Sequence, residues 1–103
     1  AKELMFAGDH ISAGEAVALG LANRVVPPDE LMPACMALAE KIAAKSPLTL
    51  KLLKRTLANG ADMSLPSALA HEQAMISLAL DSEDAHEGCG AFLEKRAANF
   101  TGS

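Results

Sequence analysis

The sequence predicts an all-α protein in which short helices are followed by longer amphipathic helices. Half of the 103 residues are hydrophobic, which is far more than a disordered segment carries. The apolar residues are mostly Ala, Leu and Met, whereas aromatic residues make up 3% of the chain and all of them are Phe. Because strands are rich in β-branched and aromatic side chains, this composition favours helix over sheet. We expect a single domain, residues 1–103, with a modest core.

Residues 1–28 are predicted to form two short helices and an extended segment. The first helix is expected to end at Gly8. Ser12, followed three residues later by Glu15, has the pattern of a capping box and predicts the start of the second helix. Gly20 suits the end of that helix, because glycine adopts a positive φ without steric cost.

The extended segment "NRVV" is stopped by Pro27 and Pro28 and is too short and isolated to build a sheet. Residues 29–103 are then predicted to be helical, with short joints and no internal repeat. In the first long helix, apolar residues recur at three- and four-residue steps and should form one stripe. The members of this stripe are Leu31, Cys35, Leu38 and Ile42.

Two further helices are predicted from their start signals. Ser46 is a cap residue and Pro47 suits the first helical position, while the dipeptide Asn59-Gly60 is expected to end this helix. A Ser-Leu-Pro-Ser stretch from Ser64 opens the next helix, which is predicted to run to about Leu80. Its stripe consists of Leu65, Leu69, Glu72 and Ile76.

Charge and cysteine content restrict the class of protein. The formal charge of −4 and the pI near 5.2 argue against broad nucleic-acid binding, which needs a basic face. The two cysteines, Cys35 and Cys89, fit neither a disulfide framework nor a zinc site, and this favours a reducing compartment. There is no apolar run near the roughly 20 residues that span a bilayer and no signal-peptide pattern. We therefore expect a cytoplasmic protein with no membrane partner and no bound metal.

The histidines and cysteines are the first candidates for chemistry. His10, His71 and His86 have no acid or nucleophile at a recognisable spacing, so surface or capping roles are favoured over catalysis. Cys89 lies three residues after His86, near a predicted helix start that would lower the pKa of a thiol. A small buried residue where helices approach closely is the simpler interpretation of Cys89, and the reactive thiol is the alternative.

The charged clusters also have two interpretations. Glu83, Asp84 and Glu87 are expected to meet the positive end of the last helix dipole. The basic residues are expected mainly on solvated helical faces, with contact to a phosphate as the alternative. They form two clusters, Lys51, Lys54 and Arg55, and Lys95 and Arg96.

Three stretches resemble the carboxyl-terminal portion of the enoyl-CoA hydratase/isomerase (crotonase) family. They are "AKELMFAGDHISAGEAVALGLANRVVPPDEL", "LAEKIAAKSPLTLKLLKRTL" and "DSEDAHEGCGAFLEKRAANFTG". The third is similar to the family pattern "D-x-x-E-G-x-x-A-F-x-E-K-R-x-P-x-F-x-G". Ala22, where the family usually has Val, and Ala98, where it commonly has Pro, are mild departures. The match covers essentially the whole chain in order.

The resemblance implies where a ligand would be held. Phe92 and Lys95 match the family's "A-F-x-E-K-R" segment, on a terminal helix that lies near the CoA site in the family. The resemblance therefore assigns both to CoA binding, on one face of that helix. Glu87 and Gly88 are also matched, whereas the position of Cys89 is variable and asks for no thiol.

The resemblance also implies what this chain does not carry. In the family, an upstream ββα core supplies the oxyanion hole and two catalytic glutamates, and the matched region begins after that core. No catalytic residue and no cofactor is therefore assigned, and the CoA thioester is the substrate of the parent enzyme. The expected role is a C-terminal oligomerisation and CoA-contacting region, inactive by itself, of an enzyme of fatty-acid or related acyl-CoA catabolism. Its partners would be the core and further copies of the chain. A free-standing, non-catalytic helical association module is the alternative.

Overall fold

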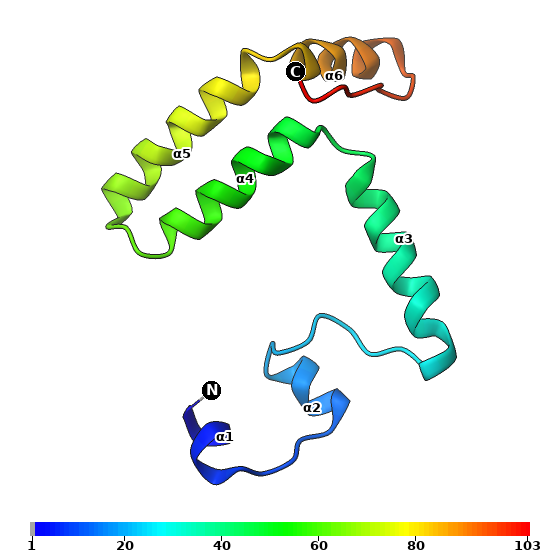
Figure 1. The fold of residues 1–103 in the computed structure, drawn as a ribbon, viewed down its shortest axis with the longest axis vertical. Coiled ribbons are helices and arrows are strands. Elements are labelled where there is room, and N and C mark those ends of the chain that lie inside the picture. Colours follow the sequence, from blue (N-terminus) through cyan, green and yellow to red (C-terminus); the bar gives the residue numbers. More distant parts are fainter. Residues whose placement is uncertain (1) are drawn as a thin grey trace. The chain divides into compact units, whose positions relative to one another are not determined.

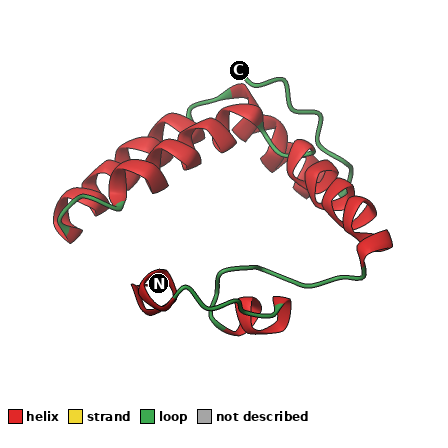
Figure 2. Ribbon diagram, turned by 60° about the horizontal axis from the view of Figure 1, so that its bottom comes forward, coloured by secondary structure: helices red, strands yellow, loops and turns green. Residues whose placement is uncertain are grey.

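The computed structural model describes residues 2–103, and every ordered element among them is a helix (Figures 1 and 2). The all-α class predicted from composition is confirmed. The elements in chain order are α1 (Lys2–Ala7), α2 (Ala13–Ala18), the 3₁₀ helix η1 (Pro28–Glu30), α3 (Leu31–Ala43), α4 (Pro47–Gly60), α5 (Leu65–Leu80) and α6 (Glu83–Glu94).

The chain divides into two compact units, and the boundary between them lies between Ala37 and Leu38, inside α3. Residues 29–37 therefore group with the N-terminal part of the chain, although the helical region predicted from the sequence begins at residue 29. The assignment of residues 1–103 to a single domain stays a prediction.

In the N-terminal unit, both short helices end and begin where the sequence predicts. Ser12 and Glu15 form the expected capping box: the Glu15 N–H donates to Ser12 Oγ at 3.2 Å, and the Ser12 N–H donates to Glu15 Oε2 at 2.8 Å. Gly8 and Gly20 follow the two helices with φ values of 70° and 75°. The left-handed region is costly for residues with a Cβ atom, so glycine fits both positions.

The segment between α2 and α3 contains one element that the sequence analysis did not predict. Residues 24–27 are irregular and form no strand. The 3₁₀ helix η1 then leads directly into α3, with Pro28 at its first position. A proline at a helix start has no N–H to leave unpaired, which explains why Pro28 and, two residues into α3, Pro33 are tolerated.

The C-terminal unit is built on the antiparallel pair α4 and α5, which lie side by side in both views (Figures 1 and 2). Ser46 caps α4 by accepting a hydrogen bond from the Thr49 N–H at 3.1 Å, and Pro47 occupies the first helical position, as predicted. The prediction that Asn59-Gly60 ends α4 needs a small correction. Helical geometry continues through Gly60, and Ala61 is the C-cap.

The core is smaller than the composition allows. Among the described residues, two apolar side chains are buried, Leu52 of α4 and Ala91 of α6. Helix α5 is apolar over much of its circumference, yet none of its residues is buried. The predicted apolar stripes of α3 and α5 are also exposed to solvent: Leu38 is 44% exposed and Leu69 is 54% exposed. A helix that is apolar on several faces is normally buried in a larger protein, so α5 has the surface of an internal helix.

Candidate functional site

Several of the candidates lie on α6 or directly after it, next to the C-terminal tail, which we define as residues 97–103. Helix α6 begins after Ser82, whose Oγ accepts a hydrogen bond from the Ala85 N–H at 3.1 Å. After α6 the chain reverses, and the tail runs back beside the helix (Figure 1). The Phe100 ring lies 3.4 Å from the position that a Cβ atom would occupy on Gly88, so a glycine there lets the tail lie close.

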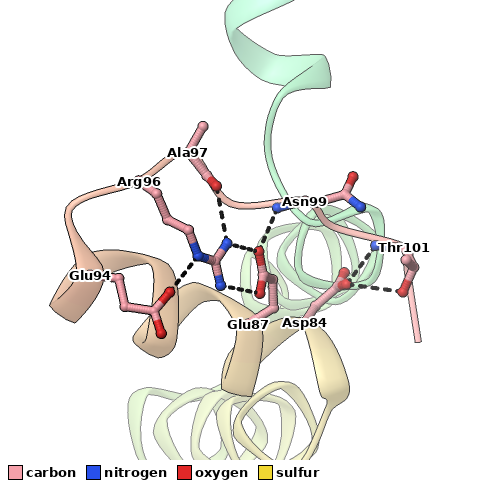
Figure 3. Close-up of polar contacts among 7 residues, drawn as sticks. All are labelled: Asp84, Glu87, Glu94, Arg96, Ala97, Asn99 and Thr101. Carbon is pink, nitrogen blue, oxygen red and sulfur yellow. Dashed lines mark hydrogen bonds and ion pairs between the residues drawn. The ribbon is translucent and has the colours of Figure 1, made fainter.

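Asp84 anchors the end of the tail and is 2% exposed. Its Oδ1 accepts hydrogen bonds from the Thr101 N–H at 2.7 Å and the Gly102 N–H at 3.1 Å (Figure 3 shows the contact with Thr101). The Asp84 N–H in turn donates to the Ser103 carbonyl at 3.0 Å. The Ser46 hydroxyl, followed by these main-chain donors, lowers the pKa of Asp84 despite its burial. Asp84 therefore joins the start of α4, the start of α6 and the tail.

Glu87 and Arg96 form the second attachment of the tail (Figure 3). Arg96 Nη1 and Nη2 donate to the two carboxylate oxygens of Glu87 at 2.6 and 2.8 Å, and Arg96 Nε donates to Glu94 Oε2 at 2.6 Å. Glu87 also accepts from the Asn99 N–H at 2.7 Å. The Arg96 guanidinium and this N–H hold the pKa of Glu87 at about 2, below its ordinary value of 4.5.

These carboxylates line a cavity of about 550 Å³ together with Glu83, His86 and Arg96. The cavity lacks the features of a hydratase site. A general acid or base needs a pKa near the working pH, whereas the pKa values of Asp84 and Glu87 are lowered. The N–H groups of residues 84–86 at the start of α6 all have acceptors within the chain, so they leave no oxyanion hole. Asp84 and Glu87 hold the tail instead.

The structure places Phe92 and Lys95 at the opposite end of α6 from the Asp84 anchor. Phe92 is 82% exposed and Lys95 is exposed. The expectation that both residues share a face of one helix needs correction, because α6 ends at Glu94. Lys95 is the C-cap, in the left-handed conformation with φ 55° and ψ 38°.

The other candidates are not assembled into a site. Cys89 lies mid-helix, away from the N-terminus of α6, and it is exposed, so the interpretation as a buried residue between helices is wrong for this chain. His86 Nδ1 lies 3.0 Å from the Ser82 carbonyl, and His71 Nε2 lies 3.4 Å from Asn59 Nδ2. The His86 contact is local, four residues apart, and the His71 contact joins α5 to α4, so neither histidine is paired with an acid or a nucleophile. His10 is exposed in the turn after Gly8.

The two basic clusters have different surroundings. Lys51, Lys54 and Arg55 are exposed on α4 and form no ion pair with any of the described residues. Arg96 forms ion pairs with Glu87 and Glu94, so Lys95 and Arg96 do not act as one basic patch. Within residues 2–103, no helix is long and apolar enough to cross a membrane, and no group of three or more acids, histidines or cysteines is arranged to hold a metal.

Comparisons with known proteins identify relatives for the whole chain. The family model described as "Enoyl-CoA hydratase/isomerase" matches residues 1–103. Crotonyl-CoA hydratase of Syntrophomonas wolfei is 39% identical over 100 residues, which are 97% of this chain and 38% of that protein. The 2,3-dehydroadipyl-CoA hydratase of Escherichia coli is 36% identical over 102 residues, 99% of this chain and 40% of the relative.

A solved structure of an enoyl-CoA hydratase is similar to this chain. Enoyl-CoA hydratase from Bacillus anthracis matches with a TM-score of 0.95 and 36% identity, over 99% of this chain and 40% of that one. The chain therefore spans about two fifths of the length of the relatives it matches.

Proposed function

Because the chain belongs to the enoyl-CoA hydratase/isomerase family, we propose that residues 1–103 are the CoA-contacting and assembly region of an enzyme that hydrates 2-enoyl-CoA thioesters. The all-helical fold is that of the carboxyl-terminal domain of the crotonase fold. The enzyme would act in fatty-acid or related acyl-CoA catabolism. Its two free thiols, Cys35 and Cys89, favour the reducing cytoplasm as its location.

The observation that carries this proposal is the pair of exposed groups at the end of α6. Phe92 offers an aromatic surface that is 82% exposed, against which an adenine ring or pantetheine arm could pack. Lys95 offers an ammonium group that has no ion-pair partner among residues 2–103 and that could meet a CoA phosphate. The resemblance selects the same two positions.

The reaction itself would belong to a ββα core outside these residues. Hydration of an enoyl thioester requires donors for the enolate oxygen and acids that activate water and move a proton. Asp84 and Glu87 of α6 serve to hold the tail, and the lowered pKa values of these two carboxyl groups make them poor proton carriers at neutral pH. This region would therefore contribute substrate binding, while the core contributes the chemistry.

A Lys95→Ala substitution tests the contact with CoA in a hydratase that carries residues 1–103. We expect KM for crotonyl-CoA to rise about three- to tenfold with kcat nearly unchanged, because a contact far from the reacting carbons binds ground and transition states alike. Steady-state kinetics give both constants. Lys41→Ala, at an exposed position in the last turn of α3, is the matched control and should leave KM unchanged. An unaltered KM in the Lys95 variant would contradict the proposal.

The assembly role is supported by the uncovered apolar side chains of the long helices. Leu65 is 73% exposed and Leu80 is 65% exposed, and α5 has no buried residue. In the proposed enzyme, the core and neighbouring subunits would cover these side chains. Large contiguous apolar surfaces are uncommon on monomeric proteins and drive association.

We therefore expect the purified chain to self-associate as a helical species. Size exclusion coupled to light scattering at micromolar concentration should give masses above the 10.7 kDa of the monomer. Leu65→Lys on exposed α5 should shift the distribution toward monomer, whereas Lys54→Gln on the polar face of α4 should not. A cooperatively folding species of monomer mass would argue against an assembly role.

A further inference from the structure

The residue in the least favourable backbone conformation is one of the two proposed CoA contacts. Lys95 has a φ of 55° and is the non-glycine residue with positive φ among residues 2–103. The other positions with positive φ are Gly8, Gly20 and Gly102. A side chain with a Cβ atom is disfavoured in the left-handed region, and such a conformation persists where its surroundings over-determine it.

Main-chain hydrogen bonds alone do not distinguish Lys95 from an ordinary helix end. The Lys95 N–H donates to the Phe92 carbonyl at 3.3 Å, and the Arg96 N–H donates to the Ala91 carbonyl at 3.0 Å. This is the pattern of a Schellman motif, in which glycine usually takes the left-handed position. A further restraint is needed to explain a lysine there.

The side chain of Arg96 supplies that restraint (Figure 3). Its guanidinium makes a two-pronged contact with Glu87 in the second turn of α6 and a third bond, from Nε, to Glu94. The residues on both sides of Lys95 are thereby joined to each other, and residue 96 is tied back to the helix. The backbone at Lys95 is held from both ends.

The same contacts determine which cation remains available. Glu87 and Glu94 are the nearest acids in the sequence to Lys95, and both are paired with Arg96. Arginine suits this task because its planar fork matches a carboxylate in two places, whereas a lysine makes a single point contact. Lys95 therefore keeps no ion-pair partner among the described residues.

We propose that Glu87 and Arg96 are positioning residues that hold Lys95 in its left-handed conformation and keep its ammonium free of carboxylates, so that it can meet a phosphate of CoA. This inference rests on the proposed function, in which Lys95 contacts CoA. Neither Glu87 nor Arg96 needs to touch the ligand. The low pKa of Glu87, about 2, means that the pair stays ionised at any pH at which an enzyme would work.

The test uses three variants of a hydratase that carries residues 1–103. Arg96→Lys keeps the positive charge but loses the two-point contact with the Glu87 carboxylate. Glu87→Gln keeps an acceptor for the Asn99 N–H but loses the ion pair. Lys95→Met removes the ammonium group itself. Glu83→Gln, at an exposed position in the first turn of α6, is the control. Amide hydrogen exchange at residues 96 and 99 reports whether the chain after α6 stays attached to the helix, and calorimetric titration with coenzyme A reports the affinity.

We expect both Arg96→Lys and Glu87→Gln to speed amide exchange at residue 96 and to weaken coenzyme A binding about threefold or more, with kcat little changed. Glu83→Gln should change neither. Lys95→Met should weaken binding without speeding exchange at Asn99. Unchanged exchange in the first two variants would overturn the inference.

Faster exchange with unaltered affinity in those variants would also overturn the inference. If Lys95→Met still weakened binding in that case, the contact with CoA would stand and only the positioning role would fail. If the Lys95→Met enzyme bound coenzyme A as tightly as the unmodified enzyme, Lys95 would not contact CoA, and the inference would be wrong as well.

Discussion

The 103-residue chain is expected to hydrate crotonyl-CoA no faster than buffer alone. A single oxyanion-hole donor contributes about 10²- to 10³-fold to the rate, and general acid–base catalysis contributes about 10²- to 10⁴-fold. The α6 cavity offers neither: the N–H groups of residues 84–86 have internal acceptors, and Asp84 and Glu87 hold the tail. The loss relative to a complete hydratase should thus be many orders of magnitude.

Loss of the conjugated enoyl absorbance measures this activity directly, with a complete enoyl-CoA hydratase as the positive control. Turnover by the chain that exceeds the buffer blank and persists through a second purification would show that residues 1–103 carry a catalytic site of their own. In that case the division between a binding region and a separate core would be wrong.

Substitution of Asp84 by Ala is expected to release the end of the tail. Asp84 supplies the acceptors for the Thr101 and Gly102 N–H groups, and hydrogen bonds to a charged acceptor are among the stronger ones in proteins. Amide exchange at these two positions should accelerate about 10- to 100-fold. Asp84→Asn keeps one acceptor oxygen and should give a smaller acceleration.

Glu83→Gln is the matched control, because Glu83 precedes Asp84 in the same turn of α6 but is exposed. Exchange at Thr101 and Gly102 should be the same in this control as in the unmodified chain. If Thr101 and Gly102 exchanged at the same rate in the Asp84→Ala chain as in the unmodified chain, the tail would be held by other contacts, such as the packing of Gly102 against Pro47.

The attachment of the tail should also depend on pH in the acid range. Both anchors have a folded-state pKa below the ordinary value: Asp84 is lowered from 3.8, and Glu87 is lowered from 4.5 to about 2. Their contribution to stability is therefore fully present above about pH 4.5 and is lost as the pH falls toward 2. Tail amides followed by NMR between pH 6 and pH 2 should lose protection only at the acid end, and loss near neutral pH would contradict the assignment of these anchors.

Local signals in the sequence were sufficient for most helix boundaries. The capping box of Ser12 and Glu15 and the Ser46-Pro47 start involve partners three residues apart, so the pattern contains both halves of each interaction. The family resemblance in turn extends over the whole chain, and the family match confirms it. Local and family-level patterns agree on the fold.

The role of the α6 carboxylates could not be predicted in the same way. The groups that Asp84 and Glu87 hold are main-chain N–H groups 12 to 18 residues later, and any non-proline residue supplies such a donor. Glu87 and Arg96 are nine residues apart in the sequence, which is not the three- or four-residue spacing that predicts a contact on one helix face. The glycines at positions 88 and 102, which lie against Phe100 and Pro47, were the local signals of a close tail.

Two other features depend on information that the local pattern does not contain. A left-handed helix end is normally marked by glycine or asparagine, and the lysine at position 95 gives no such signal. In the proposed arrangement, the contacts of Arg96 with Glu87 and Glu94 hold Lys95 in this conformation. The exposure of Cys89 and of α5 depends on which neighbouring chain segments are present. The sequence predicted an apolar stripe on α5 but contains no signal of what covers it, and in the proposed enzyme the core and neighbouring subunits would do so.

The central claim is that the end of α6 contacts coenzyme A, and hydrogen exchange with and without the ligand tests it most directly. In a hydratase that carries residues 1–103, saturating coenzyme A should slow amide exchange across Phe92–Arg96 and leave the α4–α5 turn at residues 61–64 unaffected. Protection by coenzyme A elsewhere in the enzyme, with unchanged exchange across Phe92–Arg96, would contradict the account.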